Sequence, residues 1–177
     1  MTTRQHLPRL ALARTSGLLL LLMGSVLALG DDSQYPIEIA ADSAVREEPS
    51  GKTLYRGDVV LTRGSLRIES NELSFTEADT GSTMIAATGA PASLRQKPSA
   101  DAPEVIASAD LIEYHETDER VRLIGNAKIT QDGAVITGST IDYLIPSQRV
   151  IAAGSASGDT QERVKVTIPP NSLRENR

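Results

Sequence analysis

The sequence predicts an all-β protein built as a stack of bent antiparallel hairpins. Apolar and polar residues alternate over much of residues 35–168, which is typical of strands with one buried face. Residues 41–75 align without a gap on residues 109–143, so that Gly57 falls on Gly125 and apolar residues keep the same even spacing. A repeated β unit of this kind buries its apolar face by stacking on its neighbours. The collinear repeat and the regular turns favour a stack over a Greek-key sandwich.

The expected strands follow one another with short turns between them. The longest loop signal is residues 97–103, which contain two prolines and separate the two large repeats. Gly57 and Gly125 are expected to mark bulges or bends, because glycine relieves the strain of a sheet corner. No amphipathic helix of useful length is expected. The expected strands are residues 35–41, 53–63, 65–69, 72–76, 83–87, 92–96, 104–114, 120–130, 134–145, 149–153 and 164–168, with turns at 46–52, 77–82 and 115–119.

Residues 1–30 have the pattern of a secretory signal peptide. Three arginines precede the apolar segment 18–29, and small residues at its end suit a cleavage site. This segment is shorter than the ~20 residues that span a bilayer, which favours cleavage over an uncleaved anchor. We therefore expect an exported chain with a single β domain over residues 31–170 and a flexible tail over 171–177.

The composition of the expected exported part limits the classes of function. Without the three arginines of residues 1–30, 15 basic residues face 23 acidic ones, a net charge of −8. This charge disfavours binding to nucleic acid or to an anionic membrane surface. The chain has no cysteine, so its stability has to come from burial and strand pairing. With no tryptophan and one phenylalanine, the interior has to be aliphatic, which suits alkyl chains better than planar ligands.

The sequence lacks the side-chain groups of an enzyme or a metal site. One histidine, His115, remains after residues 1–30, and it falls in a polar turn. It supplies neither the three or four ligands of a metal nor an oriented catalytic base. The acidic pairs at 47–48 and 118–119 fall at equivalent turns of the repeat and are explained by solvation. No glycine-rich segment joins a strand to a helix, so we expect no nucleotide site, no cofactor and no enzymatic activity.

The inner face of the expected stack is the candidate binding site. Its alternating apolar residues are consistent with a self-filled core and with a groove that leaves room for a ligand. The shortage of large aromatic side chains slightly favours the groove. The candidate lining residues are the apolar members of alternating strands, namely Ile37, Ile39, Leu61, Ile68, Leu94, Ile112, Tyr114, Leu123, Ile129, Ile136 and Ile141.

Motifs along nearly the whole expected exported chain carry a family resemblance. They are residues 35–42 (YPIEIAAD), 55–68 (YRGDVVLTRGSLRI), 87–92 (ATGAPA), 109–110 (AD), 123–127 (LIGNA) and 136–143 (ITGSTIDY). In this order and spacing they resemble the OstA-like family of lipopolysaccharide-transport proteins. The resemblance implies a slightly twisted β-jelly-roll of stacked V-shaped antiparallel strands. It also implies a periplasmic location and a hydrophobic groove for the acyl chains of lipid A.

The resemblance further implies where lipid and partner proteins bind. Ile37, Leu94 and Tyr114 match lipid-contact positions, and Leu94 stands where the family can carry an aromatic residue. Protomers are implied to join head to tail. An LptC-like inner-membrane partner is implied at the N-terminal edge and an LptD-like outer-membrane partner at the C-terminal edge. The edge residues are then Tyr35, Ile37, Ile39, Val164, Val166 and Ile168.

Two alternatives stay open at the level of the sequence. Arg63, Arg67, Arg120 and Arg122 either attract lipid phosphates locally or lie on solvated strand faces. The protein either carries lipid or is a periplasmic scaffold that polymerises through its edge strands. Co-isolation of the purified protein with lipopolysaccharide would separate the last two.

Overall fold

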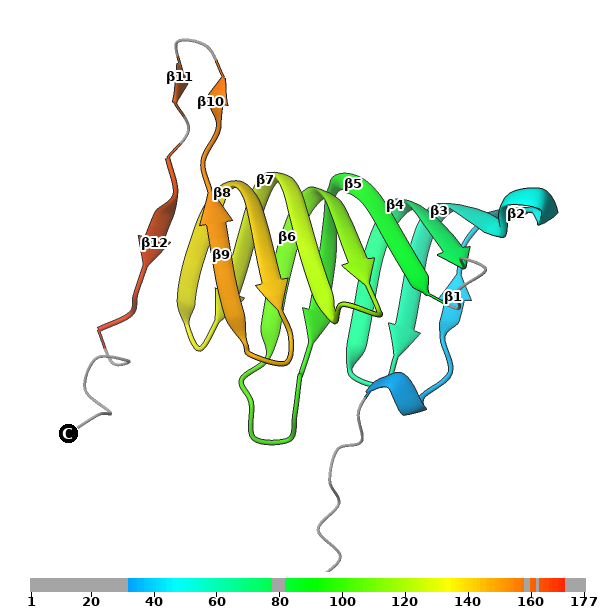
Figure 1. Cartoon of the computed structure of the whole chain (residues 1–177), viewed down its shortest axis with the longest axis horizontal. Helices are drawn as coiled ribbons and strands as arrows, with labels where there is room; N and C mark the ends of the chain where they lie inside the picture. Colours follow the sequence, from blue (N-terminus) through cyan, green and yellow to red (C-terminus); the bar gives the residue numbers. More distant parts are fainter. Residues whose placement is uncertain (1–31, 78–81, 158–159, 162, 171–177) are drawn as a thin grey trace, which may run out of the picture.

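The structure, a computed structural model, describes residues 32–77, 82–157, 160–161 and 163–170. Ten of its strands form one antiparallel sheet in the order β1-β3-β4-β5-β6-β7-β8-β12, with β2 also paired to β3 and β9 to β8 (Figure 1). The predicted all-β class is confirmed. The strands of this sheet are β1 (Glu38–Ala40), β2 (Ser43–Glu47), β3 (Lys52–Arg63), β4 (Leu66–Glu77), β5 (Thr83–Gln96), β6 (Val105–His115), β7 (Arg120–Gln131), β8 (Ala134–Leu144), β9 (Arg149–Ala153) and β12 (Lys165–Thr167).

Short elements lie at the two ends of the stack. A 3₁₀ turn, Asp32–Gln34, precedes β1, and a second one, Glu48–Ser50, joins β2 to β3. The strands β10 (Ala156–Ser157) and β11 (Thr160–Gln161) pair only with each other in the described part of the chain. Their hairpin projects beyond the sheet, between β9 and β12 (Figure 1).

The long strands bend at a common line. The pairing register shifts near the middle of every neighbouring pair from β3–β4 to β7–β8, as bulges do. Gly57 and Gly125 lie on this line with φ of +83° and +75°. A Cβ atom on Gly57 would lie 2.1 Å from Asp42 Oδ2, and one on Gly125 would lie 2.5 Å from Asp110 Oδ2. The prediction that both glycines serve the bend is confirmed.

The bend divides the sheet into two arms. The first arm begins with β1 and ends with β12, and it contains the halves of β3 to β8 that pair in register with them. The second arm begins with β2 and ends with β9. Side chains of both arms belong to one buried apolar cluster, so the arms pack face to face like a closed V. The hydrophobic core is therefore the space between the arms.

The internal repeat of the sequence is a repeat of strands. β7 begins at Arg120, 68 residues after β3 begins at Lys52. β8 begins at Ala134, 68 residues after β4 begins at Leu66. In the first repeat, the two short strands β1 and β2 together correspond to β6. The break between them lies at Asp42.

Several expected strand boundaries were wrong. The expected strand 35–41 is reduced to β1, because Tyr35 N–H bonds to Asp32 O (3.1 Å) and the residues before Glu38 lie outside the sheet. Part of the expected turn 46–52 is strand β2, whose residues are all exposed and so give no alternating pattern. The expected separate strands 65–69 and 72–76, and likewise 83–87 and 92–96, are the continuous bent strands β4 and β5.

Some expectations lie outside the described residues. These are the signal peptide at 1–30, the tail at 171–177 and most of the turn at 77–82. The loop at 97–103 lies between β5 and β6, as predicted.

Candidate functional site

Two continuous apolar rows line the space between the arms. In each row, every residue is the register partner of the following one, which lies on the neighbouring strand. Each row thus crosses the whole stack from one end to the other. The row of the first arm is Ile39, Leu61, Ile68, Leu94, Ala107, Ile129, Ile136 and Val166. The row of the second arm is Ala44, Tyr55, Leu73, Ala87, Ile112, Leu123, Ile141 and Ala152.

The structure brings together the groove residues expected from the sequence. Ile39, Leu61, Ile68, Leu94, Ile129 and Ile136 belong to the first row, and Ile112, Leu123 and Ile141 to the second. Tyr114 lies in a neighbouring inner position, paired with Ile85 and Val121. Ile37 packs against the same core from just before β1. The central members are buried, so the rows are packed against each other along most of the stack.

The rows become accessible at the ends of the stack. Ile39 is half-buried at the N-terminal end, and Val166 is 53% exposed at the C-terminal end. Val164 and Ile168 are also exposed, as is Tyr35. Four strands have one neighbour each in the sheet, namely β1 and β2 at one end and β9 and β12 at the other. The expectation of one edge strand per end was therefore too simple, because each arm has its own edge.

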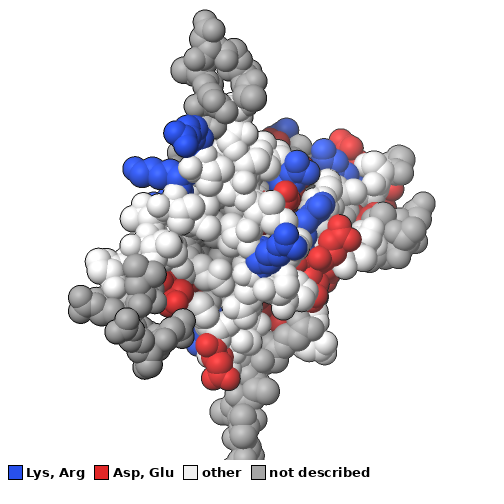
Figure 2. Space-filling model, turned by 60° about the vertical axis from the view of Figure 1, so that its left-hand side comes forward, with Lys and Arg blue, Asp and Glu red and all other residues white. Residues whose placement is uncertain are grey.

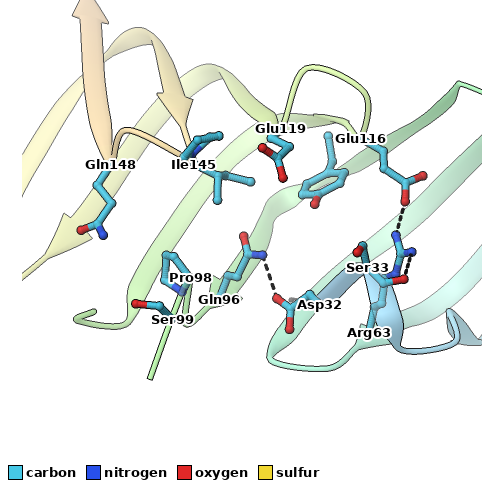
Figure 3. A pocket seen from close by; sticks show the side chains of 12 residues that line it. Asp32, Ser33, Arg63, Gln96, Pro98, Ser99, Glu116, Glu119, Ile145 and Gln148 are labelled. Carbon is cyan, nitrogen blue, oxygen red and sulfur yellow. Dashed lines mark hydrogen bonds and ion pairs between the residues drawn. The ribbon is translucent and has the colours of Figure 1, made fainter. Parts of the chain in front are cut away.

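A cavity of about 320 Å³ lies where the tips of the two arms meet. Arg63 and Gln96 reach it from the first arm, and Glu119 and Ile145 from the second (Figure 3). Tyr114 of the second arm also lines it. We call this opening between the tips the mouth. Its rim is polar, and Tyr114, one of the residues that line it, belongs to the apolar core.

Contacts of the N-terminal segment close one side of the mouth. The Asp32 carboxylate accepts hydrogen bonds from Ser65 N–H (2.7 Å), Ser65 Oγ (2.8 Å) and Gln96 Nε2 (2.8 Å). Arg63 donates to the carbonyl oxygens of Ser33 (2.8 Å) and Tyr35 (3.1 Å). Its guanidinium also forms an ion pair with Glu116, across the mouth (Figure 3).

Burial changes the acidity of two tyrosines in the core. Burial raises the pKa of Tyr114 to about 12, and the nearby Arg63 guanidinium partly offsets this rise. Burial also raises the pKa of Tyr143 above its ordinary value. Both phenols therefore stay neutral at physiological pH, as the apolar interior requires.

Sequence reasoning missed the residues that close the mouth. Arg63 was assigned either to lipid phosphates or to a solvated face, and its side chain is only 14% exposed. The solvated interpretation is wrong for Arg63, because it donates to two backbone carbonyls of the N-terminal segment and pairs with Glu116 of the second arm. Arg67 and Glu69 form an exposed pair on the outer face at 2.7 Å. Arg120 and Arg122 lie 3.9 Å from Asp118 and Asp142, respectively.

The surface near the C-terminal end carries few charges. Turned so that the side of β9 and β12 comes forward, the molecule shows a broad uncharged area with charged side chains around it (Figure 2). Among the residues that the structure describes, no group of three histidine, cysteine, aspartate or glutamate side chains could hold a metal ion. None of the helices within those residues has the length and apolar character to cross a membrane.

Comparisons with known proteins agree with this geometry. Residues 38–149 match the family model described as LptA/(LptD N-terminal domain) LPS transport protein. The lipopolysaccharide export system protein LptH of Pseudomonas aeruginosa is 35% identical over 149 residues, covering 81% of this chain and 85% of LptH. LptA of Haemophilus influenzae is 28% identical over 160 residues, covering 89% and 90%. The crystal structure of P. aeruginosa LptH, the LptA homologous periplasmic component of a lipopolysaccharide transport device, superposes with a TM-score of 0.73 at 33% identity. That match covers 80% of this chain and all of the LptH structure.

Fold and interior together define an open-ended antiparallel β stack with continuous apolar rows. The chain belongs to the LptA/LptD N-terminal domain family of lipopolysaccharide-transport proteins. The predicted OstA-like resemblance and jelly-roll architecture are confirmed by this membership and by the LptH structure. The expectation that the chain is not an enzyme is confirmed as well, because the relatives are transport proteins.

Proposed function

We propose that this protein carries lipopolysaccharide across the periplasm with the acyl chains of lipid A held between its two arms. The observation that carries the proposal is the pair of uninterrupted apolar rows, which run from one open end of the stack to the other. The names of the relatives support the lipopolysaccharide part of the proposal. The sugar part of the ligand stays outside, where the rim of the mouth is polar.

The size of the hydrophobic effect explains why such a carrier is needed. Each methylene group exposed to water costs about 0.8 kcal/mol, so one acyl chain exposed to the periplasm costs on the order of 10 kcal/mol. Aliphatic rows offer a similar surface at every strand, which lets a chain slide without a deep trap.

The same proposal includes a bridge between the membranes. Edge strands recruit further strands, and the N-terminal edges differ from the C-terminal edges, so contacts between copies do not close on themselves. Protomers add head to tail, with an LptC-like partner at β1 and β2 and an LptD-like partner at β9 and β12. The exposed apolar residues Val164, Val166 and Ile168 support this use of the C-terminal edge.

Site-specific photo-crosslinking in cells tests the groove. A crosslinker at Ile37 or Tyr114 should capture lipopolysaccharide, because both side chains pack on the inner core. A crosslinker at Glu47 or Asp118 should not, because both residues are exposed. Equal labelling of the two sets would show that lipid does not lie between the arms.

A second candidate is a periplasmic scaffold that polymerises through its edges. The exposed apolar residues Val164, Val166 and Ile168, in and beside β12, favour it, since such an edge also suits simple polymerisation. The crosslinking experiment separates the two, because a scaffold forms protein–protein adducts at its edges and no lipid adducts at Ile37 or Tyr114.

A further inference from the structure

An ion pair joins the tips of the two arms. Arg63 ends β3 in the first arm, and Glu116 begins the turn after β6 in the second arm. Their side chains are 14% and 31% exposed, so the pair is partly withdrawn from solvent and only weakly screened by salt. By contrast, Arg67 and Glu69 pair on the outer face with 45% and 52% exposure.

The N-terminal segment 32–35 braces this pair. Arg63 donates to Ser33 O and Tyr35 O, and these two hydrogen bonds hold its guanidinium in position to pair with Glu116. Asp32 ties the same segment to the turn at Ser65 and to Gln96. Arg63 is thus preorganised toward the second arm, which lowers the entropy lost when the pair forms.

The cavity beside the pair is lined by polar residues and by two side chains with large apolar surfaces, Tyr114 and Ile145. Tyr114 is 8% exposed and belongs to the apolar core. Gln96 is 4% exposed, and its Oε1 atom has no hydrogen-bond partner among the residues that the structure describes. A buried free acceptor costs energy unless a donor reaches it, so a hydroxyl-bearing ligand head would be stabilised here. The arrangement matches an amphiphile whose chain points inward and whose head stays at the rim.

We propose that the mouth is a lateral access site through which an acyl chain reaches the groove, and that the Arg63–Glu116 ion pair is the latch that holds it shut. This inference rests on the function proposed above. The inner rows are packed together, so a chain inserted from the side has to separate the arm tips and break the pair. The rate of uptake is then proportional to the fraction of molecules with an open mouth.

Variants at Glu116 test the latch directly. Glu116→Gln keeps the shape of the side chain and removes its charge, while Glu116→Lys places a like charge opposite Arg63. Association of fluorescent lipid A, followed by stopped flow, should be on the order of tenfold faster for Glu116→Gln, since a charged hydrogen bond of this kind opposes opening by roughly 1.4 kcal/mol. Glu116→Lys should be faster still. Dissociation should keep the wild-type rate, because the latch is already open in the bound state.

The matched control is Glu69→Gln, which removes an exposed arginine–glutamate ion pair from the outer face. It should leave both rates at the wild-type value. Unchanged association in both Glu116 variants, or equal acceleration by Glu69→Gln, overturns the latch. A Glu116 variant that merely loosens the fold would speed dissociation and weaken binding, which also counts against the latch. Failure of the wild-type protein to bind lipid A would instead refute the proposed function.

Discussion

Replacing Gly125 by alanine tests the physical account of the bend. Gly125 has a φ of +75°, a left-handed conformation that costs an L-residue about 1–2 kcal/mol. The new Cβ would also lie 2.5 Å from Asp110 Oδ2, so the carboxylate has to move. That movement removes the hydrogen bond from Asn126 Nδ2 to Asp110 Oδ2, which measures 2.9 Å. An exposed bond of this kind is worth about 1 kcal/mol.

These two effects predict a loss of about 2–3 kcal/mol in the free energy of unfolding, which lowers the melting temperature by roughly 6–10 °C. Gly133→Ala is the matched control. Gly133 has a similar φ of +72°, but its Cβ would meet only Pro169, at 3.0 Å from Cγ. The control should therefore lose only the backbone contribution of about 1–2 kcal/mol.

Urea unfolding followed by circular dichroism measures both variants, together with Asp110→Ala and the double variant Asp110→Ala/Gly125→Ala. The double variant should be more stable than the sum of the two single losses predicts, because the clash is gone. The account of the bend is refuted when Gly125→Ala costs no more than Gly133→Ala, or when the losses at Asp110 and Gly125 simply add.

Three further outcomes follow from burial and edge exposure. Ile68→Ala should lower the free energy of unfolding by about 2–5 kcal/mol in urea, because Ile68 is 0% exposed. Ile106→Ala, on the outer face, should change it by no more than about 0.5 kcal/mol, and equal losses would contradict the assignment of the inner face. Tyr114 has a raised pKa of about 12, so its contribution to stability is complete below pH 10 and is lost as the pH rises from 10 to 12. Tyr114→Phe should remove that part of the dependence of the unfolding free energy on pH, and an unchanged dependence would contradict this account. Val166→Lys should abolish concentration-dependent oligomers in analytical ultracentrifugation, whereas Ile106→Lys should leave them intact, because Ile106 is 40% exposed on the outer face of β6, inside the sheet and away from both edges. Oligomers of normal size in the Val166 variant would exclude β12 as the joint.

Periodic features of the structure could be predicted from the sequence. The 68-residue offset placed Gly57 and Gly125 at equivalent positions, and both lie on the bend. Local alternation also gave the inner face correctly, since Leu61 and Leu123 are both fully buried. In these segments each residue's environment depends mainly on its own strand, so a local pattern is enough.

Features that depend on distant residues could not be predicted in this way. Strand β2 has no buried residue, and its strand conformation comes from its pairing with β3 rather than from its own pattern. Arg63 and Glu116 are far apart in the sequence, and their contact exists only because the arms close on each other. Propensity and periodicity carry no information on such a contact, and the packing of the two arms decides it.

The strand repeat gives this architecture a natural unit of length. Residues 52–119 contain four strands and their turns, and β7 then starts the same pattern again at Arg120. Because neighbouring strands lie ~4.8 Å apart, one unit adds about 19 Å to the stack. A further copy of this unit would lengthen the interior while keeping its side chains in register, since each strand from β3 to β8 pairs with the strand before it and the strand after it. The span of such a protein thus changes in whole units, with no new interface to evolve.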